Sequence, residues 1–114
     1  MRVRWNDRSK KQLRKTANYI GKKFGETAKR DFLQEMKHTN ALLGDNPNMG
    51  PLEVYLSDLP SMYRSVVVRH HNKIVYRIVD DHIEVVALWD TRREPKNQAQ
   101  QVKDNPEMRS IQRS

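Results

Sequence analysis

With 114 residues, the chain has the length of a single domain. Its 22 Lys and Arg against 14 Asp and Glu give a formal net charge of +8, which favours a polyanionic partner or an acidic protein partner. The absence of cysteine excludes a disulfide framework, a thiolate metal site and a cysteine nucleophile.

The first 30 residues carry half of the 22 Lys and Arg, against only Asp7 and Glu26. They contain no apolar stretch of signal-peptide length, and no apolar run in the chain reaches the roughly 18 residues of a membrane helix. We therefore expect a cytoplasmic protein. The basic surface is either a solvated helix face or a docking surface for phosphates or an acidic partner, and the sequence leaves both open.

Residues 2–5 are predicted to form a short strand, and Asp7 is a candidate N-cap for the helix that follows. Apolar residues then recur at helical spacing, at Leu13, Ala17, Ile20 and Phe24. Gly25 ends this helix, and a second begins near Glu26. Its apolar side is formed by Ala28, Phe32, Met36 and Leu43. Because the link is short, the two helices are expected to form an antiparallel hairpin.

The segment Gly44-Asp45-Asn46-Pro47 stops the second helix, and a loop is expected to about Ser61. Three strands should follow, over 62–70, 73–79 and 82–92, with turns at His71-Asn72 and Asp80-Asp81. Residues 98–114 are polar and are predicted to form a weakly ordered tail.

Strict alternation along these strands predicts the two faces of the sheet. The face expected to pack on the helical hairpin carries Val67, Ile74, Tyr76, Ile78, Ile83, Val85, Ala87 and Trp89. The other face mixes cations with aliphatic residues: Arg64, His70, Lys73, Arg77, Glu84, Asp90 and Arg92, with Val66, Val68, Val75, Val86 and Leu88. Arg77 opposes Glu84 in this register, as a surface ion pair of little energetic weight. The fold class is therefore α+β in the order β-α-α-β-β-β, with the helical hairpin packed on one face of a small, mainly antiparallel sheet.

Several segments, in this order and at these spacings, resemble the RelE/ParE toxin superfamily of bacterial type II toxin–antitoxin modules. They are Asn46-Pro47-Asn48-Met49-Gly50, Tyr63-Arg64-Ser65, Lys73-Ile74-Val75-Tyr76-Arg77-Ile78 and Leu88-Trp89-Asp90-Thr91-Arg92-Arg93-Glu94-Pro95. The resemblance covers residues 1–97, which would be the toxin domain. It implies a small toxin that is held inactive by an antitoxin encoded beside it. Members of the RelE branch cleave mRNA in the ribosomal A site, whereas members of the ParE branch inhibit DNA gyrase without nuclease activity.

Cleavage of the RelE type requires attack by a 2′-hydroxyl on the adjacent phosphorus and stabilisation of the pentavalent phosphate, without a metal. By resemblance, Lys73 falls where these nucleases have an arginine, Arg93 near their later phosphate-stabilising arginine, and Arg64 near a lysine. Three departures weaken the match to the nucleases: Lys73 replaces their arginine, no Tyr or His follows His82, and Asp90 stands where some relatives have histidine. The pair Arg92-Arg93 is the best functional candidate; alternatively it is an exposed terminus that binds the acidic antitoxin.

The leading prediction is a metal-independent, ribosome-dependent mRNA endonuclease with no cofactor. Its catalytic residues would be Lys73, Arg92 and Arg93, with Arg64 and Arg77 binding RNA; its partners would be the cognate antitoxin, the ribosome and mRNA. The alternative from a different functional class is a ParE-like, non-catalytic inhibitor of DNA gyrase. A third possibility is a degenerate, non-toxic homologue.

Overall fold

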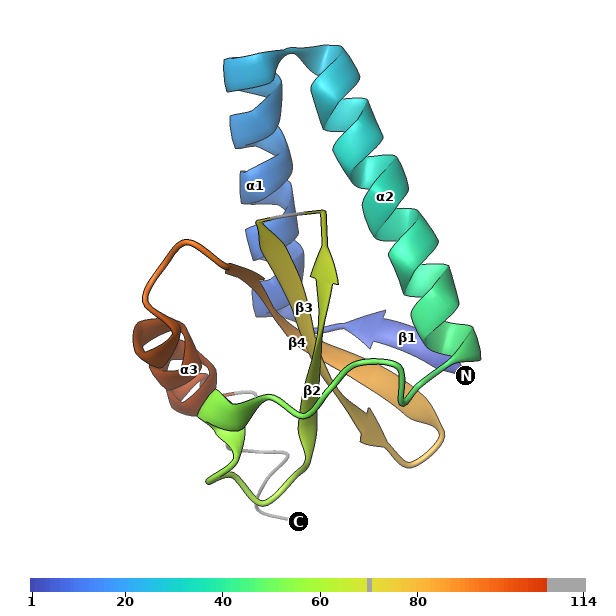
Figure 1. Ribbon diagram of the computed structural model, residues 1–114, viewed down its shortest axis with the longest axis vertical. Coiled ribbons are helices and arrows are strands. Elements are labelled where there is room, and N and C mark those ends of the chain that lie inside the picture. Colours follow the sequence, from blue (N-terminus) through green and yellow to red (C-terminus); the bar gives the residue numbers. More distant parts are fainter. Residues whose placement is uncertain (70, 107–114) are drawn as a thin grey trace.

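The computed structural model describes residues 1–69 and 71–106. Its elements, in chain order, are β1 (Arg2–Trp5), α1 (Asp7–Phe24), α2 (Glu26–Asp45), the 3-10 helix η1 (Val54–Leu56), β2 (Tyr63–Val68), β3 (Asn72–Val79), β4 (His82–Asp90) and α3 (Pro95–Asp104) (Figure 1). The predicted α+β class and the order β-α-α-β-β-β are confirmed. The structure adds the C-terminal helix α3.

The four strands form one sheet in the order β1-β4-β3-β2. β1 runs parallel to β4, whereas β2, β3 and β4 are joined by antiparallel pairs, so the sheet is mainly antiparallel as predicted. The N-terminal strand therefore lies at one edge, beside the last strand of the chain. This pairing brings the start of α1 directly onto the central part of the sheet, where Asn6 N–H donates to Val85 O over 3.0 Å.

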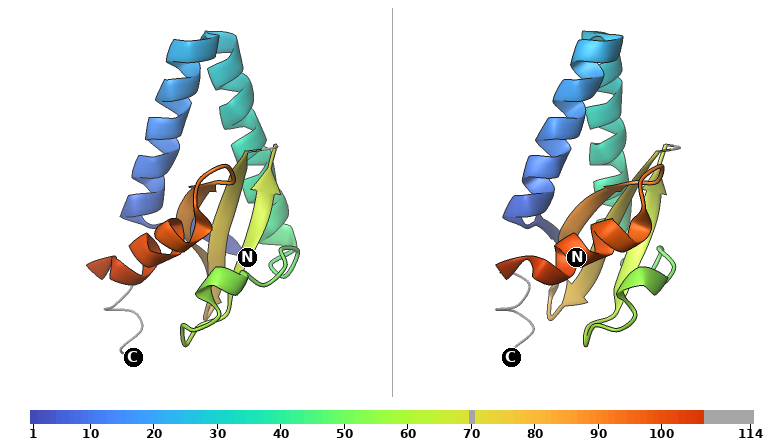
Figure 2. Two further views of the ribbon diagram at one scale, coloured as in Figure 1. Left: turned by 60° about the vertical axis from the view of Figure 1, so that its left-hand side comes forward. Right: turned by 90° about the vertical axis from the view of Figure 1, so that its left-hand side faces the viewer.

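The helical hairpin begins and turns at residues suited to those positions. Asn6, rather than the predicted Asp7, is the N-cap, because its side chain accepts a hydrogen bond from Ser9 N over 2.9 Å. Asp7 is instead the first helical residue, where a negative charge favours the helix dipole. Gly25 links the helices at φ 99° and ψ 169°, a conformation open almost only to glycine. Figures 1 and 2 show the hairpin extending well beyond the sheet.

The hairpin packs on one face of the sheet, as predicted, but its contacts with β2 are not the predicted ones. The core on this side includes Ala17, Phe32, Met36, Leu43, Val66, Val68, Ile74, Tyr76, Ile83, Val85 and Leu88. Val66 pairs with Ile74 and Val68 with Asn72, so three residues separate β2 from β3 instead of two. Arg69, the first of these three residues, takes a left-handed conformation at φ 54°. One extra turn residue reverses the faces of β2, and Val67, predicted to be in the core, is exposed.

A β-bulge reverses the end of β4 in the same way. Val75 pairs with Ala87 but Tyr76 pairs with Val85, which leaves Val86 as the extra residue. Beyond it, Ala87 and Trp89 point away from the hairpin and Leu88 points toward it, the opposite of the prediction. His70, which was assigned to the polar face, lies outside the described residues.

The second face of the sheet is covered by α3 rather than open to solvent. Ala99 and Val102 of α3 pack with Leu56, Tyr63, Val75, Val86, Ala87 and Trp89 in a second core cluster. Glu94 caps the helix by accepting from Lys96 N, and Pro95 occupies its first turn. Residues 98–104 of the tail predicted to be weakly ordered therefore belong to a packed helix, in which Ala99 and Val102 are buried. The remainder of that predicted tail, residues 107–114, lies outside the described residues.

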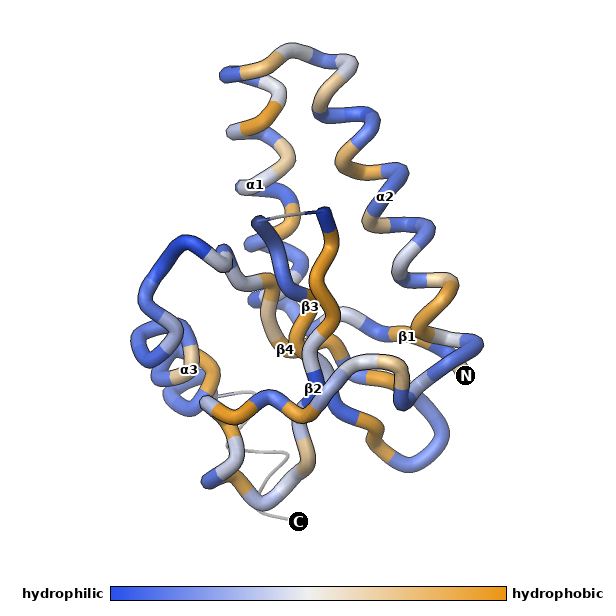
Figure 3. Tube along the Cα trace, viewed as in Figure 1, coloured by the Kyte–Doolittle hydropathy of each residue, from blue (hydrophilic) through white to orange (hydrophobic). Residues whose placement is uncertain are grey.

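Hydropathy follows this two-sided packing. In Figure 3, β2, β3 and β4 carry apolar stretches, whereas apolar and polar residues alternate along α1 and α2. The alternation matches helices that bury one side only. Within the described residues, no helix combines the length and the apolar character needed to cross a membrane.

Candidate functional site

Lys73 lies on the α3 side of the sheet and is held by two contacts. It pairs with Trp89 across the β3–β4 ladder, and its Nζ stands 5.6 Å from the centroid of the Trp89 ring. The same nitrogen forms an ion pair of 2.6 Å with Oε1 of Glu53. The Lys73 side chain keeps 26% of its exposure, whereas the Glu53 side chain keeps 3%. The predicted catalytic cation is thus already neutralised by a buried carboxylate.

Glu53 comes from the loop before β2, which runs alongside that strand. Its backbone N–H donates to Tyr63 O over 2.8 Å, and its carboxylate accepts from Ser65 Oγ over 3.0 Å and from Tyr55 N over 3.2 Å. Burial raises the pKa of Glu53, but the hydrogen bonds from Lys73, Tyr55 and Ser65 outweigh it and hold the pKa below the usual value. The carboxylate is therefore ionised at neutral pH and repels any phosphate that approaches Lys73.

Arg64 lies on the opposite face of the sheet from Lys73. It pairs with Tyr76, whose ring is in the hairpin-side core, and its Nη1 donates to Gly50 O over 2.8 Å. The hydroxyl of Tyr76 accepts from Gly50 N over 3.1 Å and donates to Pro47 O over 2.7 Å. Burial raises the pKa of Tyr76. Arg64 and Tyr76 together fasten the loop after α2 to the sheet.

Arg77 is buried, which corrects two predictions. Its side chain is 3% exposed and that of Glu84 is 4% exposed, with Nη2 3.4 Å from Oε1 of the partner. Arg77 Nη1 also donates to Ser61 Oγ over 2.8 Å, and the guanidinium lies 5.8 Å from the centroid of the Tyr63 ring. The pair with Glu84 forms as predicted, but in the interior rather than at the surface. A guanidinium this enclosed has no surface on which to bind RNA.

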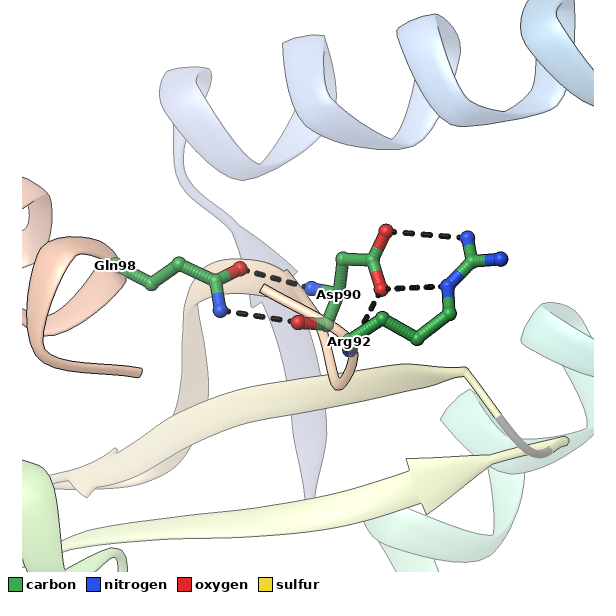
Figure 4. A network of polar contacts seen from close by, with 3 residues as sticks. All are labelled: Asp90, Arg92 and Gln98. Atoms are coloured by element: carbon green, nitrogen blue, oxygen red, sulfur yellow. Dashed lines mark hydrogen bonds and ion pairs between the residues drawn. The ribbon is translucent and has the colours of Figure 1, made fainter. Parts of the chain in front are cut away.

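Arg92 and Arg93 follow β4 in an exposed turn. Arg92 forms an ion pair with Asp90, with Nε 3.1 Å from Oδ1 and Nη2 3.2 Å from Oδ2 (Figure 4). The hydrogen bond from Arg92 lowers the pKa of Asp90, and the same bond raises the pKa of Arg92. Gln98 of α3 completes this network, since its side chain accepts from Asp90 N over 2.8 Å and donates to Asp90 O over 3.0 Å (Figure 4).

The structure gathers only part of the predicted site. Lys73 and the Arg92-Arg93 turn belong to neighbouring segments at one end of the β3–β4 ladder, because Asn72 pairs with Asp90. Arg64 is on the other face and Arg77 is enclosed. Glu53 and Gln98 were not among the residues predicted from the sequence. Glu53 could have been noticed as a single acid between apolar residues, in Pro51-Leu52-Glu53-Val54. Nothing in the polar stretch around Gln98 distinguished that residue from its neighbours.

A groove opens elsewhere, between the hairpin and β1. It has a volume of about 890 Å³ and combines an apolar floor with a basic rim. The floor is formed by Val3, Trp5, Leu13, Leu33 and Met36; the rim includes Arg2, Arg4, Lys10, Arg14 and Lys37. No acidic residue lines it among the described residues. For metals, the described part of the chain contains no group of three potential His, Cys, Asp or Glu ligands close enough to share an ion.

Comparison with known proteins gives one family and a fold. A family model described as the ParE toxin of a type II toxin–antitoxin system, parDE, matches residues 3–95. A structure of a chromosomal ParDE system from P. aeruginosa is similar with a TM-score of 0.65 and 15% identity, over 79% of this chain and 95% of that chain. A YoeB dimer from Staphylococcus aureus is similar with a TM-score of 0.54 and 15% identity, over 78% and 94% of the two chains. No curated protein matches the chain. The predicted resemblance is confirmed, and identities this low support the fold alone.

Proposed function

The chain belongs to the ParE family of toxins from type II toxin–antitoxin systems, and from that premise we propose that it arrests growth by binding DNA gyrase rather than by cutting mRNA. This proposal reverses the order of the two alternatives that the sequence offered. The reason is the arrangement of the cations that a metal-free nuclease would need to hold and polarise a phosphate.

The ion pair of Lys73 with Glu53 carries the proposal. A catalytic cation must offer its charge to the scissile phosphate, whereas Lys73 is shared with a buried carboxylate at 2.6 Å. The other predicted RNA contacts do not compensate, since Arg64 is on the opposite face and Arg77 is enclosed. A toxin whose cations maintain the fold fits a protein-binding inhibitor better than a nuclease.

Induction of the chain without its antitoxin distinguishes the two modes of action. We expect growth arrest with intact mRNA 5′ ends by primer extension, together with induction of a DNA-damage reporter. Cuts within codons of translated messages would contradict the proposal. Normal growth at a verified protein level would also contradict it and would favour the degenerate homologue.

The second candidate remains the ribosome-dependent mRNA endonuclease, and one observation favours it. Arg93 is exposed beside Arg92, at the same end of the β3–β4 ladder as Lys73. A substrate that displaced Glu53 from Lys73 would find three cations from adjacent segments. On this candidate, Arg93→Ala should abolish codon-dependent cuts, and Lys96→Ala, which removes an exposed cation from α3, should leave them unchanged.

The cognate antitoxin is the partner that the family membership implies, and we infer that its toxin-binding segment occupies the groove between the hairpin and β1. A groove with an apolar floor and five cations on its rim is complementary to an acidic amphipathic segment that folds on binding. Leu33→Glu should weaken the complex with the protein encoded by the adjacent reading frame. Leu42→Glu is the matched control, because both leucines are on α2 and are 38% and 39% exposed, but only Leu33 lines the groove. Equal losses in calorimetric affinity would contradict the assignment.

A further inference from the structure

The solvent-facing side of α1 carries a row of lysines that neither the sheet nor the groove uses. Lys11, Lys15 and Lys22 are exposed and lie within about 40° of one another around the helix axis. Leu13, Ala17 and Ile20, on the opposite side of α1, pack against the hairpin-side core. The three lysines, here called the α1 ridge, are therefore on the side of α1 away from the core, and α1 itself lies along an outer edge of the molecule (Figures 1 and 2).

The charges of the α1 ridge are not compensated within the described residues. None of its three lysines takes part in an ion pair there, and Asp7 is the single acid of α1. Other cations of the hairpin are engaged: Arg8 donates to Gln101 over 3.2 Å, Lys29 donates to Asn18 over 3.1 Å, and Lys23 lies 5.6 Å from the Tyr19 ring centroid. Asp7 lies four residues before Lys11, in the favourable i,i+4 arrangement, but Lys15 and Lys22 have no such acid within α1, so an external anion would relieve their charge.

The spacing of the α1 ridge matches a polyanion. At about 1.5 Å of rise per residue, Lys11 and Lys15 are separated by about 6 Å and Lys15 and Lys22 by about 10 Å along the axis. Duplex DNA offers one negative charge per roughly 1.7 Å of its axis, so a straight helix can meet a phosphate at each lysine. The helix that carries the ridge lies along an outer edge of the molecule (Figures 1 and 2), and a protruding helix suits a duplex rather than a threaded single strand.

We propose that the α1 ridge binds the backbone of double-stranded DNA without sequence preference. Tyr19, which is 52% exposed, lies four residues after Lys15 and three before Lys22 on α1. One aromatic side chain is less apolar area than the centre of a protein interface requires, so an acidic protein partner fits the ridge less well. The basic groove beside β1, which has such a centre, faces a different side of α1. This DNA contact needs neither gyrase nor the antitoxin, so it goes beyond the proposed function and does not depend on it.

Fluorescence anisotropy with the full chain and a labelled 24-base-pair duplex tests this inference over a series of salt concentrations. The variant Lys11→Gln, Lys15→Gln, Lys22→Gln removes the ridge charges. The control Arg30→Gln, Arg69→Gln, Lys96→Gln removes the same net charge from three exposed residues outside the ridge and the groove. Each phosphate contact contributes about 0.9 to the slope of log affinity against log salt, so the ridge variant should lose a slope of about 2.7. Between 50 and 200 mM salt, the affinity of the native chain should then fall about 40-fold more than that of the ridge variant.

Retention of the native slope by the control variant would support the assignment to the ridge. Equal losses in both variants would overturn it in favour of diffuse net charge, and tighter binding to single-stranded RNA of equal length would overturn the choice of duplex DNA. A chain that inhibits gyrase but does not bind the duplex would overturn this inference alone. Duplex binding without gyrase inhibition would support it while contradicting the proposed function.

Discussion

Lys73, the predicted catalytic cation, forms an ion pair with Glu53, a buried carboxylate that was not predicted from the sequence. Glu53 is fixed by three donors besides its own backbone contact with β2, so it cannot move aside without breaking them. Residues of the same chemical type therefore differ in what they can do: Arg93 is exposed, Lys73 is neutralised and Arg77 is enclosed. Surroundings rather than residue type decide which cations can meet an anion.

Glu53 should make stability depend on acidic pH. Its folded pKa lies below the unfolded value of about 4.3, so its contribution is present above that pH and is lost as the pH falls through the folded pKa. Glu53→Gln should thus be less stable than the native chain at pH 7, with the gap narrowing as the pH falls below the unfolded pKa in urea denaturation. Asp31→Asn, which removes an exposed carboxylate, is the control. A gap that stays constant across this range would contradict the prediction.

Breaking the Arg77–Glu84 pair should lower the free energy of unfolding strongly, whereas replacing both residues by apolar ones should lower it little. Glu84→Gln leaves a buried guanidinium without its counter-charge, which is expected to cost about 3–5 kcal/mol of unfolding free energy. The double variant Arg77→Met, Glu84→Leu should recover most of that loss, because it removes both buried charges. Chemical denaturation measures both. A double variant no more stable than the single one would show that the pair contributes specific stabilisation.

On the scale of elements, α3 determines how the end of β4 is presented. Its Gln98 continues the hydrogen bonding of β4 by contacting both backbone groups of Asp90, and Ala99 and Val102 cover the second core cluster. The turn with Arg92 and Arg93 is thus tied at both ends. Removal of α3 would expose Trp89 and Val86, which are 2% and 0% exposed in the intact chain.

Gln98→Ala should loosen α3 without unfolding the sheet. Loss of two backbone contacts is expected to cost about 1–2 kcal/mol, concentrated in α3. Hydrogen exchange should therefore accelerate over residues 95–104 and stay unchanged in β3. Gln100→Ala is the control, because Gln100 is exposed and contacts only Asp104 of the same helix. Equal acceleration in both variants would contradict the role assigned to Gln98.

The turn between α1 and α2 should require glycine at position 25, whereas the nearby Gly21 should be replaceable. A side chain at φ 99° and ψ 169° is strained by about 1–3 kcal/mol, although no atom would touch its Cβ within 4 Å. Gly25→Ala should lower the thermal midpoint accordingly. Gly21→Ala, inside α1, meets only flexible side-chain atoms of Lys29 and Glu26 and gains helix propensity, so it should be neutral or stabilising. A Gly25→Ala variant as stable as the native chain would contradict the strain argument.

Patterns along the sequence predicted the helices and strands but not all of their faces. The spacing of Leu13, Ala17 and Ile20 identified the buried side of α1, since helical periodicity depends only on local geometry. The face on which a strand residue lies depends on the exact number of residues in the preceding turn and strand. One extra residue in the turn near Arg69 reversed the faces of β2, and the bulge at Val86 reversed those at the end of β4. The neutralisation of Lys73 could not be predicted, because Glu53 reaches it through a contact between distant segments.

On the scale of the whole molecule, positive charge is divided among three regions with different surroundings. The groove beside β1 combines cations with an apolar floor, the α1 ridge has cations alone, and the Arg92-Arg93 turn is partly neutralised by Asp90. The groove and the α1 ridge lie on different sides of α1. The groove and the α1 ridge therefore offer separate surfaces for the two contacts proposed above, with the antitoxin and with duplex DNA.

The supercoiling activity of purified DNA gyrase, measured with the full chain added in increasing amounts, tests the central claim most directly. We predict that relaxed plasmid is no longer supercoiled when the toxin is present, and that Arg77→Met, Glu84→Leu, which alters only buried residues, inhibits to the same extent. Undiminished supercoiling at a large excess of folded toxin, with codon-specific cuts on purified ribosomes, would contradict the account.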